Sequence, residues 1–191
     1  MSVWTLSWIP AAVCAASCHS GPSASSPSPA FLQEPVKLGT SQEALAKPKP
    51  RVLVFSKTAG FRHDSIPDGV AMLKFQCEAL GWPMTHTEDA AVFNESLSPR
   101  FDVIVFLSTT GNILDESQQQ QMERFMAMGG GFVGIHAAAD TEYEWAWYGQ
   151  MMGAYFASHP RIQPATTKII DRDHPTTSFL RPVWLRTDEW Y

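Results

Sequence analysis

The chain has 191 residues, which is enough for one domain with a hydrophobic core and an additional tail. Hydrophobic residues make up 45% of the sequence and charged residues 17%, as is typical of a soluble globular protein. The formal net charge of −5 gives no indication of a nucleic-acid partner. Of the three cysteines, Cys14, Cys18 and Cys77, only the last lies in the apparent domain, so neither a disulfide framework nor zinc-finger spacing is present.

Residues 1–18, MSVWTLSWIPAAVCAASC, have the pattern of an export signal, because small residues follow a mostly apolar core from Val3 to Val13. The segment AASC resembles a bacterial lipobox, in which Cys18 is the lipidated residue. Two features weaken this interpretation: no Lys or Arg precedes the core, and Ala15 stands where leucine is more usual. We expect an extracytoplasmic protein, either periplasmic or held at the membrane by a lipid anchor. A leader that does not function would leave it cytoplasmic.

Residues 19–50 are rich in Ser, Pro and Ala and lack aliphatic periodicity. Such a composition cannot bury enough apolar surface to fold, so we predict a disordered linker. The segment KPKPR at 47–51 ends this linker, and an apolar strand follows at once. The domain is therefore predicted to span residues 51–191.

The first part of the domain alternates between predicted strands and one predicted helix. Short apolar runs predict strands at 51–56, 83–87 and 101–109. Between the first two, an apolar stripe at helical spacing predicts a helix, which Gly81 ends. The residues of this stripe are Ile66, Val70, Leu73, Cys77 and Leu80. Ser65, together with Asp68, is predicted to start the helix in a variant of the capping box.

The second part of the domain continues this alternation. Asp115 and Gln118 predict the start of a second helix, and GGFVGIH at 130–136 is the next predicted strand. Residues 163–170 and 183–191 are predicted to form further strands. Strands that alternate with helices predict an α/β fold, in which helices cover both faces of a mostly parallel sheet.

In such a sheet, ligands bind at the carboxyl ends of the strands. Four segments follow predicted strands in this way: KTAGFRHDS, STTGNILD, HAAADTEYEWAWYG and TDEWY. The first contains His63, and the third contains His136 and a tryptophan-rich cluster. We therefore expect any site to lie around residues 57–65, 109–115 and 136–148.

His136 stands at the centre of Gly134-Ile135-His136-Ala137-Ala138, with small residues two positions before and after it. A sharp strand-to-helix elbow needs this spacing because the turn crowds its neighbours, and it pushes the central side chain out over the sheet. The nucleophile occupies this position in many α/β enzymes, but His136 is neither serine nor cysteine. It is a candidate general base, metal ligand or anchor of the loop, with a structural histidine as the alternative.

Several motifs in the expected order resemble the ThuA-like (trehalose-utilisation) family, and together they cover residues 51–191. They are VLVFSKTAGFRHDSIPDG, TEDAAVF, GGGFVGIHAAADTEYEWAWYGQMMGAYFASHP and DRDHPTT followed by TDEWY. The resemblance implies a flavodoxin-like three-layer sandwich of the class I glutamine amidotransferase-like type. True amidotransferases carry cysteine at the elbow, so His136 implies an inherited elbow without glutaminase activity. Cys77 cannot replace that cysteine, because it belongs to the apolar stripe of a helix.

The family is associated with the use of trehalose and related disaccharides, alongside sugar oxidation to 3-keto forms. The resemblance therefore implies an exported, carbohydrate-linked enzyme, a hydrolase or isomerase that acts on a disaccharide or its 3-keto derivative. The family domain usually continues beyond the DEWY motif, so we expect a domain truncated at its C-terminus, with an exposed edge through which a homodimer could form. The alternatives are a non-catalytic carbohydrate-binding or scaffold module and an inert fragment.

Two kinds of chemistry are open to the candidate residues. A metal-free acid/base site would use His136 with Asp140 or Glu189 as catalytic residues. Alternatively, histidines that converge on one cleft would bind zinc or another divalent metal, with His63, His136 and His159 as ligands. No local spacing such as HExxH supports a metal, so no cofactor is certain. His86 and His174 are expected to be structural.

The expected partner is a small-molecule carbohydrate. The candidate substrate-binding residues are Lys57, Arg62, His63, Asp64, Tyr143, Trp145, Trp147 and His159. The segment EYEWAWYG contains four aromatic residues, whose rings can stack on the C–H faces of sugars. The alternative is a loop that folds its aromatic residues into the core. Most loop cations are merely solvated, which is the alternative for Lys57 and Arg62.

Overall fold

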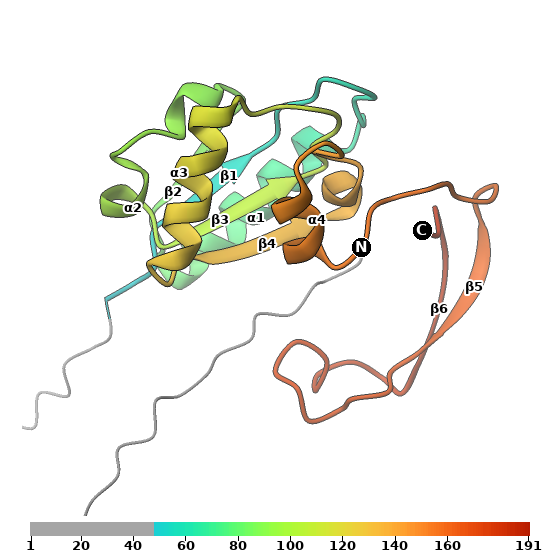
Figure 1. Cartoon of the computed structure of the whole chain (residues 1–191). Coiled ribbons are helices and arrows are strands. Elements are labelled where there is room, and N and C mark those ends of the chain that lie inside the picture. The colour runs from blue at the N-terminus through green and yellow to red at the C-terminus, as the bar shows by residue number, and fades with distance from the viewer. Residues whose placement is uncertain (1–47) are drawn as a thin grey trace, which may run out of the picture. The chain divides into compact units, whose positions relative to one another are not determined.

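The computed structural model describes residues 48–191, and Figure 1 shows the order of their helices and strands. The predicted export signal at 1–18, the candidate lipidated Cys18 and the predicted linker up to residue 47 lie outside the described residues. Residues 49–191 belong to one compact unit. Between residues 48 and 191, no helix is both long enough and apolar enough to cross a membrane.

A four-stranded parallel sheet forms the centre of the fold, with the strand order β2-β1-β3-β4. Its strands are β1 (Val52–Phe55), β2 (Met84–Thr87), β3 (Val103–Leu107) and β4 (Gly131–Ile135). β1 and β3 are the inner strands and are almost entirely buried, which explains why their sequences are continuous apolar runs. The predicted α/β fold with a parallel sheet is confirmed.

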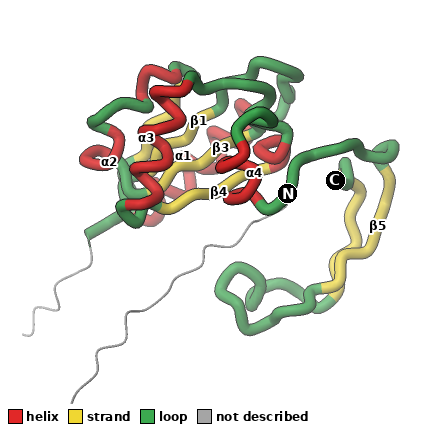
Figure 2. The backbone as a smooth tube through the Cα atoms, in the orientation of Figure 1, coloured by secondary structure: helices red, strands yellow, loops and turns green. Residues whose placement is uncertain are grey.

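Helices cover both faces of this sheet (Figure 2). The helical elements are α1 (Ile66–Leu80), α2 (Leu97–Arg100), α3 (Glu116–Ala127), α4 (Ala146–Met152) and the short 3-10 helices η1 (Ala90–Val92) and η2 (His136–Ala139). On one face, Cys77 of α1 packs in a core with Val54 and Val105. On the other face, α3 and α4 supply Phe125 and Tyr148 to a larger core. The architecture is therefore a three-layer sandwich.

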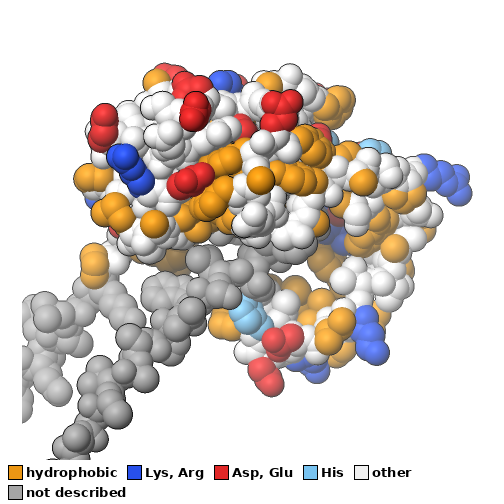
Figure 3. All heavy atoms as spheres, in the orientation of Figure 1, with side chains coloured by type: hydrophobic (Ala, Val, Ile, Leu, Met, Phe, Trp, Pro, Cys, Tyr) orange, Lys and Arg blue, Asp and Glu red, His pale blue; other side chains and the backbone are white. Residues whose placement is uncertain are grey.

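Aromatic rings fill the larger core. The ring of Phe106 lies 5.5 Å from that of Phe55 and 5.9 Å from that of Tyr148, between centroids. Partly buried hydrophobic residues, among them Phe132 and Trp147, pack against this core. Figure 3 shows hydrophobic side chains gathered between α3 and α4 on the face turned toward the viewer. Of the aromatic residues of the EYEWAWYG segment, Trp145, Trp147 and Tyr148 therefore contribute to packing on this side of the sheet.

The helix ends follow the predicted signals, with one exception. Asp115 and Gln118 cap α3 reciprocally, each accepting a hydrogen bond from the other's backbone N–H at 2.9 and 3.0 Å. Gly81 ends α1 in the left-handed conformation, with φ 65°. Ser65 precedes α1, but its hydroxyl forms no capping hydrogen bond. Its backbone already has helical dihedrals, φ −76° and ψ −6°, and not the extended ones of a capping residue, so the predicted capping box is wrong there.

The last two strands do not join the parallel sheet. β5 (Gln163–Lys168) and β6 (Val183–Asp188) pair antiparallel with each other, and Gln163 lies opposite Asp188. Several hydrophobic side chains of this hairpin and its flanks are exposed: Ile162, Ile170, Phe179, Val183 and Leu185. Because the strands run antiparallel, the residues after β6 return to the level at which β5 begins. There, Glu189 and Tyr191 contact His136, the residue that follows β4.

Candidate functional site

His136 lies at the sharp turn between β4 and η2, and its backbone is strained. Its φ is 53°, in the left-handed region that residues other than glycine adopt uncommonly. Such a conformation costs about 1–3 kcal/mol, which the surrounding structure must offset. A Cβ atom on Gly134 would lie only 3.1 Å from Ala138 Cβ and from Met152 Cε. A side chain at position 134 would press on these neighbours, so the elbow packs closely around Gly134.

Two polar side chains from distant segments of the chain, His63 and Glu189, contact His136, and a third, His159, contacts Glu189. The His63 ring packs edge-to-face against the His136 ring, with centroids 4.4 Å apart. Glu189 contacts two histidines at once: Oε2 lies 3.2 Å from His136 Nε2, and Oε1 lies 3.1 Å from His159 Nε2. Candidate ligand atoms of His63, His136 and Glu189 all lie within 4.8 Å of one another. We call these four residues, His63, His136, His159 and Glu189, the histidine cluster.

Burial controls the charge of His136. Loss of solvent lowers the pKa of its imidazole, the nearby His63 lowers it further, and the carboxylate of Glu189 opposes both effects. The neutral imidazole is therefore favoured, and it has a lone pair that can accept a proton or bind a metal. Tyr191 covers this ring, with centroids 4.8 Å apart, and burial is the main cause of the raised pKa of its phenol.

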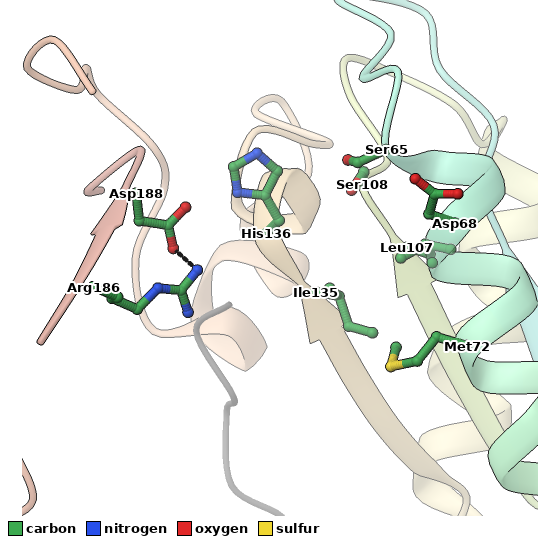
Figure 4. Close-up of a pocket in the computed structure, with 10 residues that line it drawn as sticks. Ser65, Asp68, Met72, Leu107, Ser108, Ile135, His136, Arg186 and Asp188 are labelled. Atoms are coloured by element: carbon green, nitrogen blue, oxygen red, sulfur yellow. Dashed lines mark ion pairs between the residues drawn. The ribbon is translucent and has the colours of Figure 1, made fainter. Parts of the chain in front are cut away.

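An open cavity of about 390 Å³ lies beside His136. Figure 4 shows His136 at the end of β4, between Asp68 at the start of α1 and the β6 residues Arg186 and Asp188, which form an ion pair. The ends of β3 and β4 add Ser108 and apolar atoms to its wall. The cavity thus lies at the carboxyl ends of parallel strands, where ligands bind in such sheets.

The ThuA family, described as trehalose utilisation, matches residues 51–191. The chain belongs to the ThuA family. Two solved structures resemble it: a ThuA-like protein from Bacteroides uniformis (22% identity, TM-score 0.62) and one from Parabacteroides merdae (16% identity, TM-score 0.60). The similarity covers 75% and 74% of this chain and 62% of each neighbour, so the chain spans less than two thirds of their length. At such identities the likeness establishes the fold alone. Among curated proteins, none matches the chain.

Asp140, a candidate catalytic residue of the ThuA domain, is not part of the histidine cluster. Its carboxylate accepts a hydrogen bond of 2.5 Å from the Tyr143 hydroxyl. Burial and this hydrogen bond raise the pKa of Tyr143. Tyr143 in turn stacks on Tyr155 with centroids 5.0 Å apart and keeps 44% of its surface exposed. Asp140 therefore orients an accessible aromatic ring near the elbow.

The two candidate tryptophans of the ThuA domain have different environments. Trp145 is only 8% exposed, belongs to the larger core and donates its indole N–H to Glu123 at 3.0 Å. Trp147 is partly buried and stacks on Trp145, with centroids 5.0 Å apart. The buried face of Trp145 cannot serve as a sugar platform, and its role is to pack α4 against α3.

Among the described residues, the remaining candidate residues form no hydrogen bond or ion pair with the histidine cluster. Most of them form hydrogen bonds or ion pairs elsewhere in the domain. Lys57 donates to the carbonyl oxygen of Ile113 at 2.9 Å, and Arg62 pairs with Glu88 at 2.7 Å. Asp64 is exposed. The two histidines expected to be structural form local hydrogen bonds, His86 with Ser56 and His174 with Thr176, each at 2.8 Å. Cys77 is buried, and this burial raises the pKa of its thiol.

Some residues around the cavity were not chosen as sites from the sequence. Asp68 was interpreted only as a helix-capping residue, and Arg186 lies on a strand with no pattern to single it out. Ser108, with φ 49°, directly follows β3 and begins the segment STTGNILD that the strand-end rule selects, although no pattern singles it out within that segment. Arg186 could not have been found this way, because its place beside the sheet depends on how the β5–β6 hairpin packs.

Proposed function

We propose that this ThuA-family domain is an enzyme that acts on a disaccharide or on its 3-keto derivative, as a hydrolase or isomerase centred on His136. The family description, trehalose utilisation, supports a sugar substrate. One observation carries the proposal. His136 is held in a strained conformation at the elbow, in contact with Glu189 and beside an open cavity. Strained residues beside cavities are typical of functional sites.

The cavity suits a sugar in size and in chemistry. Its volume of about 390 Å³ lies within the range usual for small-molecule sites. Carboxylate, guanidinium and hydroxyl groups from Asp68, Arg186 and Ser108 can bind sugar hydroxyls, while Leu107 and Ile135 can contact the C–H faces. Tyr143, partly exposed and held by Asp140, adds an aromatic ring near the elbow.

The histidine cluster can assist such a reaction in two ways. A ketone makes the hydrogens on neighbouring carbons acidic, and a neutral imidazole beside a carboxylate can take such a proton directly. Alternatively, imidazoles and a carboxylate can hold a metal ion that polarises the ketone oxygen. In both cases His136 is needed for turnover, and this requirement is the testable core of the proposal.

The test measures turnover of trehalose and of its 3-keto form by the purified full-length protein, followed by NMR of the sugar. The variant is His136→Asn, because asparagine tolerates the left-handed backbone and leaves the elbow intact. The matched control is His174→Asn, which alters a histidine that bonds Thr176 outside the histidine cluster. We expect His136→Asn to lower kcat/KM by more than about 100-fold and the control to match the wild type. Sugar binding without turnover in the wild type would favour the carbohydrate-binding module. Equal turnover by His136→Asn and His174→Asn would exclude a catalytic role for His136.

A further inference from the structure

We propose that His63, His136 and Glu189 bind one divalent transition-metal ion of the zinc type, and that His159 orients Glu189 from outside the coordination sphere. This inference deepens the proposed function, on which it rests for the use of the ion. The binding of the ion itself is argued from the geometry of the histidine cluster and is measured without any sugar.

The spacing of the donor atoms fits a shared ion. Zinc lies about 2.0–2.2 Å from imidazole nitrogen and carboxylate oxygen, so that two ligands of a tetrahedral site are about 3.3–3.5 Å apart. His136 Nε2 and Glu189 Oε2 are 3.2 Å apart, close to that spacing. One candidate ligand atom from each of His63, His136 and Glu189 lies within 4.8 Å of the other two. Under this proposal, rotation of the His63 side chain, which lies on the loop before α1, completes the three-ligand site.

The ligand types and their burial also suit such an ion. Two imidazoles and one carboxylate are a typical set for catalytic zinc, in which the fourth position is left to water or substrate. All three side chains are partly buried, which limits competition from bulk water. The cavity beside His136 would supply the open position. When bound, the ion would act as a Lewis acid on a sugar oxygen.

His159 occupies the place of an outer partner. Its Nε2 contacts Glu189 Oε1, the oxygen that does not face His136, at 3.1 Å. Its Nδ1 lies 2.9 Å from the carbonyl oxygen of Pro160, which holds the ring in position. Carboxylate ligands are commonly fixed by such hydrogen bonds, and loss of an outer partner weakens metal binding by about 10–100-fold. Loss of the His159 side chain should therefore weaken metal binding less than loss of the His63 side chain.

The role of His63 distinguishes a metal site from a network of hydrogen bonds without a metal. The contacts of Glu189 with His136 and His159 need no third histidine. His63 meets the network through ring packing on His136, and only an ion requires its nitrogen. Removal of the His63 side chain should therefore abolish metal binding while the two Glu189 contacts persist.

The experiment titrates Zn²⁺ into chelator-treated full-length protein by calorimetry, with elemental analysis of the dialysed product. We expect one zinc per chain in the wild type and an affinity lowered by more than about 100-fold in His63→Ala. His159→Ala should lose about 10–100-fold. The control, His86→Ala, alters a histidine of β2 that bonds Ser56 outside the histidine cluster and should bind as the wild type does.

Two results would overturn the metal site: no stoichiometric zinc in folded wild-type protein, or equal affinity in His63→Ala and His86→Ala. The proposed function fails separately. Zinc bound through His63 without any sugar turnover would leave the metal site in place and remove the enzyme. Undiminished turnover by the chelator-treated, zinc-free protein would leave the enzyme in place and show that the ion takes no part in the reaction.

Discussion

Glu142 offers a sharp test of how the loops around the site are held together. Its carboxylate is buried, with 1% of the residue exposed, and accepts three hydrogen bonds. Oε1 accepts from the backbone N–H groups of Ile113 and Leu114 at 2.7 and 2.8 Å, and Oε2 accepts from Gln119 Nε2 at 2.8 Å. These bonds join the loop after β3 to the loop after the elbow. The contact outweighs the strain of Glu142 itself, whose φ is 56°.

Glu142→Ala should strongly destabilise the fold. It leaves two buried backbone N–H groups without an acceptor, and each costs about 1–3 kcal/mol, so the free energy of unfolding should fall by about 2–6 kcal/mol. Glu142→Gln keeps one oxygen for both N–H groups but loses the charge assistance, and should cost about 1–2 kcal/mol. Gln119→Ala, which removes the third bond and a longer bond of 3.5 Å from Gln119 Nε2 to the Leu114 carbonyl oxygen, is the matched control and should cost about 1 kcal/mol.

Urea-induced unfolding followed by tryptophan fluorescence measures these differences, provided that the slope with urea stays constant. The predicted order of stability is wild type, Gln119→Ala, Glu142→Gln and then Glu142→Ala. If Glu142→Ala were no less stable than Gln119→Ala, the carboxylate would not be holding the two backbone N–H groups. If Glu142→Ala does not fold at all, the Glu142→Gln variant carries the comparison.

Two further predictions concern the elbow and a surface ion pair. Gly134→Val places atoms against Ala138 and Met152 and should lower the free energy of unfolding by about 1–3 kcal/mol, with a smaller loss in Gly134→Ala. Thermal unfolding measures both variants. If Gly134→Val were as stable as the wild type, the close packing of the elbow would be contradicted. The Arg51 guanidinium lowers the pKa of Asp102 to about 2, below its unfolded value. The pair's stabilisation is then complete above about pH 4 and is lost as the pH falls through about 2. The stability difference between wild type and Asp102→Asn should shrink over that range, and a constant difference would refute the assignment.

The central sheet could be predicted from the sequence because its inner strands are buried on both faces. β1 and β3 are apolar throughout, and short continuous apolar runs of this kind are typical of strands that are covered on both faces. The capping box of Asp115 and Gln118 could also be predicted, because the two residues that form it lie close together in the sequence. The antiparallel pairing of β5 with β6 was not predicted, because it depends on contacts between segments far apart in sequence.

The candidate site likewise combines residues that local sequence patterns predict with residues whose place depends on contacts between distant segments. The spacing of small residues pointed to His136, and the strand-end rule placed His63 near it. Glu189 was a candidate through the strand-end segment TDEWY and His159 by its residue type. The contact of both His136 and His159 with the Glu189 carboxylate depends on how the chain returns after β6. Trp145 followed an aromatic pattern that serves equally for packing, and only the core contacts of the ring decide between the two. Glu142 gave no signal, because its partners are backbone N–H groups.

The convergence of the histidine cluster on Glu189 underlies both proposals, and the imidazole ¹⁵N chemical shifts of the histidines test it most directly. Glu189→Gln removes a charge that contacts His136 and His159 and touches neither His86 nor His174. At constant pH, we predict that the His136 and His159 nitrogen resonances move in this variant while those of His86 and His174 stay in place. Unchanged resonances of His136 and His159 would show that Glu189 does not bridge them, and would contradict the site on which the account depends.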